Sequence, residues 1–216
     1  MSDYKFIKSW LDKDFAGKED QIKTIVEFGS RDGLDAIYLA KNFKQAKVYT
    51  FECSPRQIKL CQENIKKSNA KDRIIFINAC VSDKEEERKF YFYPENAGAS
   101  SLYIHNDKKN EKDFQLISTT LANDHLSKLG VDSIDLLCMD IQGHELYAMI
   151  GLGELLNTVK YIQIETLVGN NRSYRHSPLR SDTLKVLENF TPLDERVSGS
   201  SGDETNIIYK NNNLLM

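Results

Sequence analysis

The sequence predicts an α/β protein with a doubly wound, mostly parallel sheet, and three observations carry this prediction. A β-branched run at 24–28 passes into a loop closed by two glycines and then into residues with helical spacing. Apolar strands and amphipathic helices continue to alternate up to residue 78, as in right-handed β-α-β units. Two late strands flank a glycine-serine turn, which indicates a hairpin with one strand antiparallel to the rest of the sheet.

The first half of the chain contains three buried-type strands with helices between them. Leu34, Ile37 and Tyr38 recur at helical spacing, so we expect a helix from the second glycine to about Asn42. Pro55 suits the first turn of a second helix, where its missing N–H is no loss. The expected strands are Thr24–Phe28, Val48–Glu52 and Arg73–Asn78, and the expected second helix is Arg56–Asn69.

The alternation breaks after the third strand, which predicts a small β insertion at about 83–120. Lys89–Tyr93 is an aromatic strand ended by Pro94, and Gln115–Thr120 has the composition of another short strand. An insertion at the carboxyl edge of a sheet often shapes a substrate pocket. For the alternating aromatic residues of the strand we favour the simpler explanation of ordinary core packing.

The second half resumes the α/β pattern. We expect strands at Ile134–Asp140 and Val159–Glu165, a helix to about Leu156 between them, and a helix marked by Leu184, Val186, Leu187 and Phe190. The closing strands are expected around Leu193–Val197 and Thr205–Tyr209. We therefore predict a helical extension at 1–23, with an amphipathic patch that packs on the domain edge or covers the site, followed by one domain at 24–216.

Composition narrows the class of protein. With 40% hydrophobic and 28% charged residues the sequence is that of an ordinary globular protein, and a formal net charge of -3 gives no general argument for nucleic-acid or membrane binding. No apolar run has the length of a membrane span and Met1–Trp10 has no signal-peptide core, so we expect a cytoplasmic protein. The four cysteines form no C-x-x-C pair, which argues against a zinc site or a disulfide framework.

The glycine loop and the next strand point to a nucleoside cofactor. Glu52 ends the second strand roughly 20 residues beyond Gly29, the spacing of a carboxylate that binds ribose hydroxyls. The loop Gly29–Gly33 is not G-x-G-x-x-G, so a ligand with a ribose but no diphosphate fits best, and S-adenosylmethionine is the common one. A purely structural turn beside an exposed acid is the simpler alternative, and the glycine spacing disfavours an NAD-dependent oxidoreductase.

The order of motifs resembles the class I S-adenosylmethionine-dependent methyltransferases and, within them, the FkbM family. The matching segments are Thr119–Leu126, Ile134–Glu145, Ala148–Leu156 and Tyr161–Glu165, together with Gly98–Leu102 and Asn206–Tyr209. Three positions depart from the family pattern, which usually has lysine at Cys138, glutamate at Gln142 and alanine at His144.

The resemblance implies a seven-stranded sheet with one reversed strand and methyl transfer to an oxygen, often a hydroxyl of a sugar or another small molecule. It also implies which positions hold the cofactor: Glu27, Gly29, Ser30 and Gly33 at the methionine part, Glu52 at the ribose, Cys53 beside ribose and adenine, and Asn78, Ala79 and Cys80 around the adenine.

Transfer to an alcohol needs an aligned oxygen and a base for its proton, because the methyl group on a sulfonium is already activated. Asp140 ends the fourth strand and is our candidate for that role, with His144, Glu145 and Glu165 as further candidates. His144 and Glu145 could instead simply face solvent in the first turn of a helix. These side chains lack a clear set of metal ligands, so we predict no metal site.

The loop at 170–180 follows the fifth strand on the expected substrate side. Arg172 and Arg175 could bind a phosphate or carboxylate on the acceptor, and Tyr174 could stack on a sugar or base; a solvated loop explains them equally well. Two other functions remain open: a non-catalytic module that only binds the cofactor, and a methyltransferase acting on RNA or cap hydroxyls. No broad basic surface or RNA-binding motif supports the latter.

Overall fold

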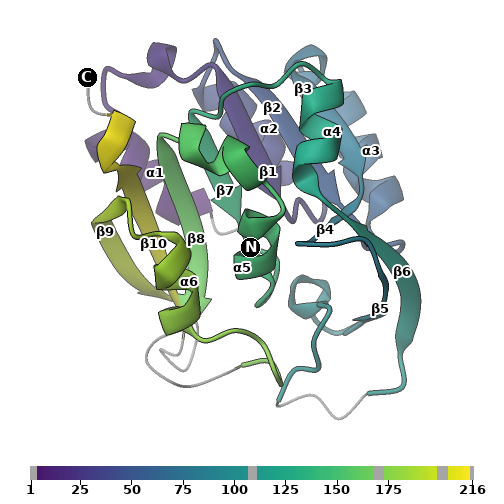
Figure 1. Cartoon of the computed structure of the whole chain (residues 1–216). Coiled ribbons are helices and arrows are strands. Elements are labelled where there is room, and N and C mark those ends of the chain that lie inside the picture. Colours follow the sequence, from purple (N-terminus) through teal and green to yellow (C-terminus); the bar gives the residue numbers. More distant parts are fainter. Residues whose placement is uncertain (1–3, 107–110, 168–172, 199–203, 215–216) are drawn as a thin grey trace.

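A seven-stranded sheet with the order β3-β2-β1-β7-β8-β10-β9 forms the centre of the computed structural model (Figure 1). The structure describes residues 4–106, 111–167, 173–198 and 204–214. The strands of this sheet are β1 (Thr24–Phe28), β2 (Lys47–Glu52), β3 (Ile74–Asn78), β7 (Leu136–Met139), β8 (Tyr161–Leu167), β9 (Phe190–Ser198) and β10 (Glu204–Asn211).

One strand of this sheet is reversed. The pairs β1–β2, β2–β3, β1–β7 and β7–β8 are parallel, whereas β10 runs antiparallel to both β8 and β9. Because β9 and β10 are consecutive strands of a hairpin inserted beside β8, one of them has to run against the sheet. The predicted fold class is therefore confirmed: a mostly parallel α/β sheet with an antiparallel strand near the C-terminus.

Helices cover both faces of the sheet. Buried side chains of α1 (Tyr4–Lys13), α2 (Leu34–Asn42) and α3 (Ile58–Lys67) pack on one face. The other face carries α4 (Ala122–Lys128), α5 (Glu145–Ile150) and α6 (Arg180–Val186) (Figure 1). Strands covered on both faces need apolar residues at every position, which explains the uninterrupted apolar runs in the sequence.

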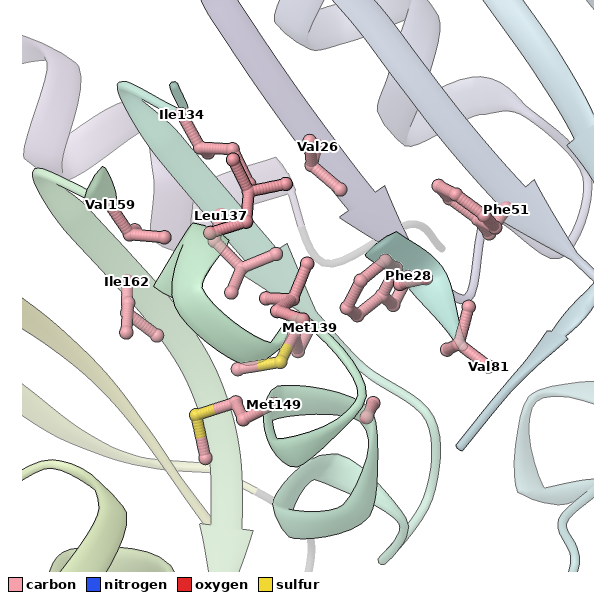
Figure 2. Packing of buried hydrophobic residues seen from close by; sticks show 14 of the residues in the cluster. Val26, Phe28, Phe51, Val81, Ile134, Leu137, Met139, Met149, Val159 and Ile162 are labelled. Atoms are coloured by element: carbon pink, nitrogen blue, oxygen red, sulfur yellow. The ribbon is translucent and has the colours of Figure 1, made fainter. Parts of the chain in front are cut away.

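The core on the α4–α6 face is shown in Figure 2. Phe28 and Phe51, from neighbouring strands, meet edge to face with ring centroids 5.2 Å apart. Leu137 and Met139 of β7 point into the same layer as Met149 of α5. The alternate β7 residues Leu136 and Cys138 belong to the opposite layer. Both layers end at the carboxyl edge of the sheet, where the strands leave the core.

A second, smaller sheet lies beyond that edge. It consists of β4 (Cys80–Val81), β6 (Phe114–Thr120) and β5 (Glu87–Tyr91), in this order. β4 is parallel to β6, and β5 is antiparallel to it. The small sheet has its own apolar cluster, to which the aromatic strand contributes Phe90 and the residues after it contribute Phe92. Phe92 thus serves core packing, and Phe90 both packs in this cluster and lines the cleft described below.

Several expected elements differ from those observed. The helix after β7 ends at Ile150 rather than near Leu156, and a 3₁₀ helix over Gly153–Thr158 follows, because Gly153 adopts a positive φ of 55°. Phe190 begins β9 instead of continuing the preceding helix, which ends at Val186. The two-residue strand β4 and the helix α4 were not expected from local pattern.

The loop after β1 touches the residue that follows β7. Gly29 has a φ of 91°, and a Cβ atom there would lie 2.0 Å from the carbonyl oxygen of Asp140. The amide of Gly29 also donates to the Phe51 carbonyl at 3.1 Å, so the loop is held from both neighbouring strands. Glycine is thus required at this position by the backbone of the protein itself.

We expect Gly29→Ala to destabilise the protein by about 1–3 kcal/mol more than Gly130→Ala, because only the first places a methyl group in occupied space. Gly130 is the matched control, since its φ of 74° is also positive but no atom lies within 4 Å of the point that a Cβ would occupy. Chemical denaturation of the two variants measures the difference. Equal losses in both would show that only backbone strain matters at Gly29.

Candidate active site

A cleft opens at the carboxyl ends of the central strands. The empty space in and above it measures about 1270 Å³, open solvent at its mouth included. Residues at the ends of β1, β2, β7 and β8 form its base, and Phe90 and Leu102 add an apolar wall from the region of the small sheet. The topology therefore brings the sequence-predicted acids to one place.

Glu27 lies inside the strand β1 and is 4% exposed. The hydroxyl of Thr50 on β2 donates to its Oε2. Burial raises the pKa of this carboxyl to about 8, and the negative charge of Asp35 contributes to the rise. Glu27 therefore carries its proton at neutral pH until a cationic partner favours the ionised form.

Glu52 ends β2 and is 7% exposed. Its carboxylate accepts backbone N–H bonds from Arg31 at 2.6 Å, Cys53 at 2.9 Å and Ser54 at 2.6 Å. Burial raises the pKa to about 7 in spite of these bonds. They fix the carboxylate in the wall of the cleft, and they hold Arg31 in its left-handed conformation, with a φ of 49°.

The other predicted cofactor residues divide into two groups. Gly29, Cys53, Ala79 and Cys80 line the same cleft as Glu27 and Glu52. Three others are not among the residues that line it: Ser30, which is fully buried, Asn78, which is exposed, and Gly33, whose added Cβ would lie 3.0 Å from Sγ of Cys61.

A hydrogen-bonded cluster joins the ends of β7 and β8. Nε2 of Gln142 donates to Oδ1 of Asp140 and, at 3.2 Å, to Oε2 of Glu165. The hydroxyl of Tyr174 lies 2.5 Å from Oε1 of the same glutamine and 3.0 Å from the carbonyl oxygen of Ala99. The structure thus brings together Asp140, Glu165 and Tyr174, all of them predicted site residues, through a glutamine that was not predicted.

The cluster continues into the reversed strand. Asn206 of β10 donates to Oε1 of Glu165 at 3.3 Å and accepts from Nε2 of Gln163 at 3.1 Å. Gln163 could have been found from sequence, because residues two apart on a strand share a face. Asn206 could not, since it reaches Glu165 only through the antiparallel register of β10 with β8.

His144 lies between the small sheet and the central sheet. It is 2% exposed, with Nδ1 3.1 Å from the hydroxyl of Tyr103 and Nε2 3.0 Å from Oγ of Ser82. Burial, helped by the positive charge of Arg88, lowers its pKa to about 3, so the imidazole is neutral at physiological pH. The ring does not face solvent; it joins the segment before α5 to Ser82, directly after β4, and to Tyr103.

Glu145 is also buried, and it shapes the loop before α5. Its Oε1 accepts the amides of Ile141 at 3.0 Å and Gly143 at 3.2 Å. Burial raises the pKa of this carboxyl to about 7. Its role is therefore to hold the backbone on both sides of Gln142.

The predicted substrate-binding residues have different environments. Tyr174 is 3% exposed and lines a smaller hollow next to the cleft, which shares Gln142 and Glu165 with it. Arg175 is exposed and forms an ion pair with Glu111. Arg172 lies outside the residues that the structure describes.

The cleft holds several acids, but they do not converge as metal ligands would. Within the described part of the chain, no group of three or more His, Cys, Asp and Glu side chains is placed to hold a metal ion. None of the helices described has the length and apolar character needed to cross a membrane.

The central sheet has the Rossmann-like fold of methyltransferases. The structure is similar to that of an O-methyltransferase from Bacillus cereus in complex with SAH, with a TM-score of 0.57, 15% sequence identity, and coverage of 97% of this chain and 82% of that one. It is also similar to magnesium protoporphyrin IX methyltransferase from Synechocystis PCC 6803 with bound SAM, with a TM-score of 0.56 at 15% identity, over 96% of this chain and 77% of that one.

Sequence comparison identifies the family. Residues 27–191 match the methyltransferase FkbM domain, so the chain belongs to the FkbM family of methyltransferases. It is 27% identical over 205 residues to the 2-O-methyltransferase NoeI of Sinorhizobium fredii, covering 88% of this chain and 80% of that protein. The family expected from the sequence motifs and its cofactor, S-adenosylmethionine, are confirmed.

We expect Glu27→Gln to make the ligand-free protein more stable at alkaline pH. The pKa of Glu27 is about 8 when folded and 4.5 ordinarily, so its contribution to stability is complete below pH 4.5 and is lost as the pH rises through 8. A neutral glutamine avoids that loss, which is on the order of a few kcal/mol at pH 8.5, so the melting temperature of the variant should be several degrees higher there.

Melting curves of both proteins from pH 5 to pH 9 test this expectation, with Glu85→Gln at an exposed position as the control. Glu52 and Glu145 are present in all three proteins, and the part of the raised pKa of Glu27 that comes from the charge of Glu52 belongs to the effect being measured. Parallel pH dependences in Glu27→Gln and the unaltered protein would contradict it.

Proposed function

We propose that this methyltransferase transfers the methyl group to a hydroxyl oxygen of a sugar or another small molecule. The observation that carries the proposal is the carboxylate pair Asp140 and Glu165, joined by Gln142 in the same cleft as Glu27 and Glu52. An alcohol oxygen needs a group that orients it and accepts its proton, and a carboxylate at a strand end can do both. The similarity to a protein named as a 2-O-methyltransferase supports an oxygen acceptor.

The residues of the cleft suit the cofactor. S-adenosylmethionine carries a sulfonium and an ammonium group, and the buried carboxyls of Glu27 and Glu52 gain most from a positively charged neighbour. We assign the methionine part to Glu27 and Gly29, and the ribose to Glu52. Cys53, Ala79 and Cys80 offer a largely apolar wall for the adenine. When bound, the cofactor supplies a methyl group that is already activated by its sulfonium.

The protein then has to align the acceptor, take up a proton and exclude water. Asp140 is exposed within the cleft and is assigned to the hydroxyl that reacts, as its orienting group and proton acceptor. Glu165 holds the acceptor from the neighbouring strand. Both nitrogens of His144 are engaged by Tyr103 and Ser82, so we assign His144 to positioning the wall rather than to proton transfer.

The cofactor assignment predicts that S-adenosylhomocysteine binds and NAD does not. Glu52→Ala should weaken S-adenosylhomocysteine binding about 10-fold or more, because one buried partner of the ribose hydroxyls is lost. Isothermal titration of both proteins with each ligand measures this, after circular dichroism has shown that the variant is folded. Preferred binding of NAD, or equal affinity in the variant, would be inconsistent with the assignment.

The role of Asp140 predicts that Asp140→Asn lowers kcat about 100-fold or more, the usual size of a general-base effect, and leaves cofactor affinity within about 2-fold. An acceptor has to be found first, by following S-adenosylhomocysteine release with sugars, phosphorylated hydroxyl compounds and capped RNA. Asp132→Asn, at an exposed position, is the control. Full turnover by Asp140→Asn would exclude Asp140 as the base.

A further inference from the structure

Gln142 contacts both acids assigned to the acceptor but is not itself able to accept the proton. We propose that Gln142 is a positioning residue, which holds Asp140 and Glu165 as one ionised pair directed at a single acceptor. The inference rests on the proposed function, since it concerns the same acceptor site.

The chemistry of its neighbours determines how the Gln142 amide is oriented. An ionised carboxylate only accepts hydrogen bonds, so the NH₂ group has to face Asp140 and Glu165, and the carbonyl oxygen faces the hydroxyl of Tyr174, 2.5 Å away. The two hydrogens of one amide group thus serve two carboxylates from adjacent strands. The opposite orientation of the amide would direct its carbonyl oxygen at two carboxylates, which have no hydrogen to donate.

The backbone of Gln142 is held as firmly as its side chain. Its φ of 55° lies in the left-handed region, which is costly for a residue other than glycine. Oγ of Ser101 donates to its carbonyl oxygen at 2.7 Å, and Glu145 binds the amides of Ile141 and Gly143 on either side. A strained conformation fixed from several directions is typical of a residue that has to present its side chain at one place.

The two hydrogen bonds donated by Gln142 affect the protonation of Asp140 and Glu165. Two carboxylates close together repel each other, and a shared donor favours the charged form of both. Several other ionisable groups line the same two hollows: Glu27, Arg31, Asp35, Glu52, Cys53, Cys80, Cys138, His144, Glu145 and Tyr174. Gln142 differs from these groups because its amide donates a hydrogen bond to each member of the pair.

Two variants separate the bridge from general packing. Gln142→Met keeps the approximate length of the side chain but removes both donors. Gln142→Glu introduces the residue usual in the family, and it places a third carboxylate beside the pair in a cleft that has Cys138 instead of the family's lysine. We expect kcat to fall about 10-fold or more in both, with S-adenosylhomocysteine affinity within about 2-fold, since a general-base contribution is impaired. The acidic limb of the pH–kcat profile should move to higher pH, furthest in Gln142→Glu. Gln62→Glu, exposed on α3, controls for the added charge.

A second measurement does not depend on turnover. Carbon-13 NMR of protein labelled at the Asp and Glu carboxyl carbons follows the protonation of Asp140 and Glu165 directly, with assignment by Asp140→Asn and Glu165→Gln. Both carboxyls should take up protons at higher pH in Gln142→Met than in the unaltered protein. Unchanged titration of both would overturn the proposal. If no acceptor is ever methylated but the titrations shift, the proposed function fails while the bridge stands.

Discussion

The close approach of Gly29 to the carbonyl oxygen of Asp140 is the constraint on which the arrangement of the cleft depends. β1 and β7 are parallel neighbours, and at their carboxyl ends the two chains come so near that a single methyl group between them would not fit. The loop that leads into α2 and the loop that leads into α5 are therefore packed against each other. As a result, the acids assigned to the cofactor and those assigned to the acceptor belong to one continuous wall rather than to two separate pockets.

Ionisable groups in this wall are held in two different ways. Burial raises the pKa of Glu27 and Glu52 in spite of the hydrogen bonds that each accepts, so ionising them costs stability in the ligand-free protein, and a cationic ligand relieves that cost. Asp140 and Glu165 are more accessible, and their neighbours are amide donors from Gln142 and Asn206. The first arrangement favours binding of a positive charge, and the second keeps carboxylates available to a neutral hydroxyl.

Local pattern was sufficient to predict the strand-loop-helix unit, Glu52 at the end of β2, and the convergence of Asp140 with Glu165. The first two follow from the hydrophobic pattern, and the convergence follows because parallel strands bring their carboxyl ends to one edge. What escaped prediction depends on contacts between distant segments: the bridge made by Gln142, the approach of Asn206, and the two partners of His144. Gly29 was singled out as a cofactor residue, which stays a prediction; its positive φ and the nearby Asp140 backbone explain why this position needs glycine.

The hydrogen bonds of His144 with Tyr103 and Ser82 have a consequence for protein engineering. The small sheet supplies Phe90 to the cleft, while Ser82, Ser101 and Tyr103 provide polar contacts between its surroundings and the loop after β7. A chimaera that exchanges the strands of the small sheet for those of another family member therefore has to carry matching partners for His144 and for the Gln142 carbonyl. If those partners are retained, the part of the cleft wall that faces the acceptor can be exchanged. The residues assigned to the cofactor then keep their own contacts.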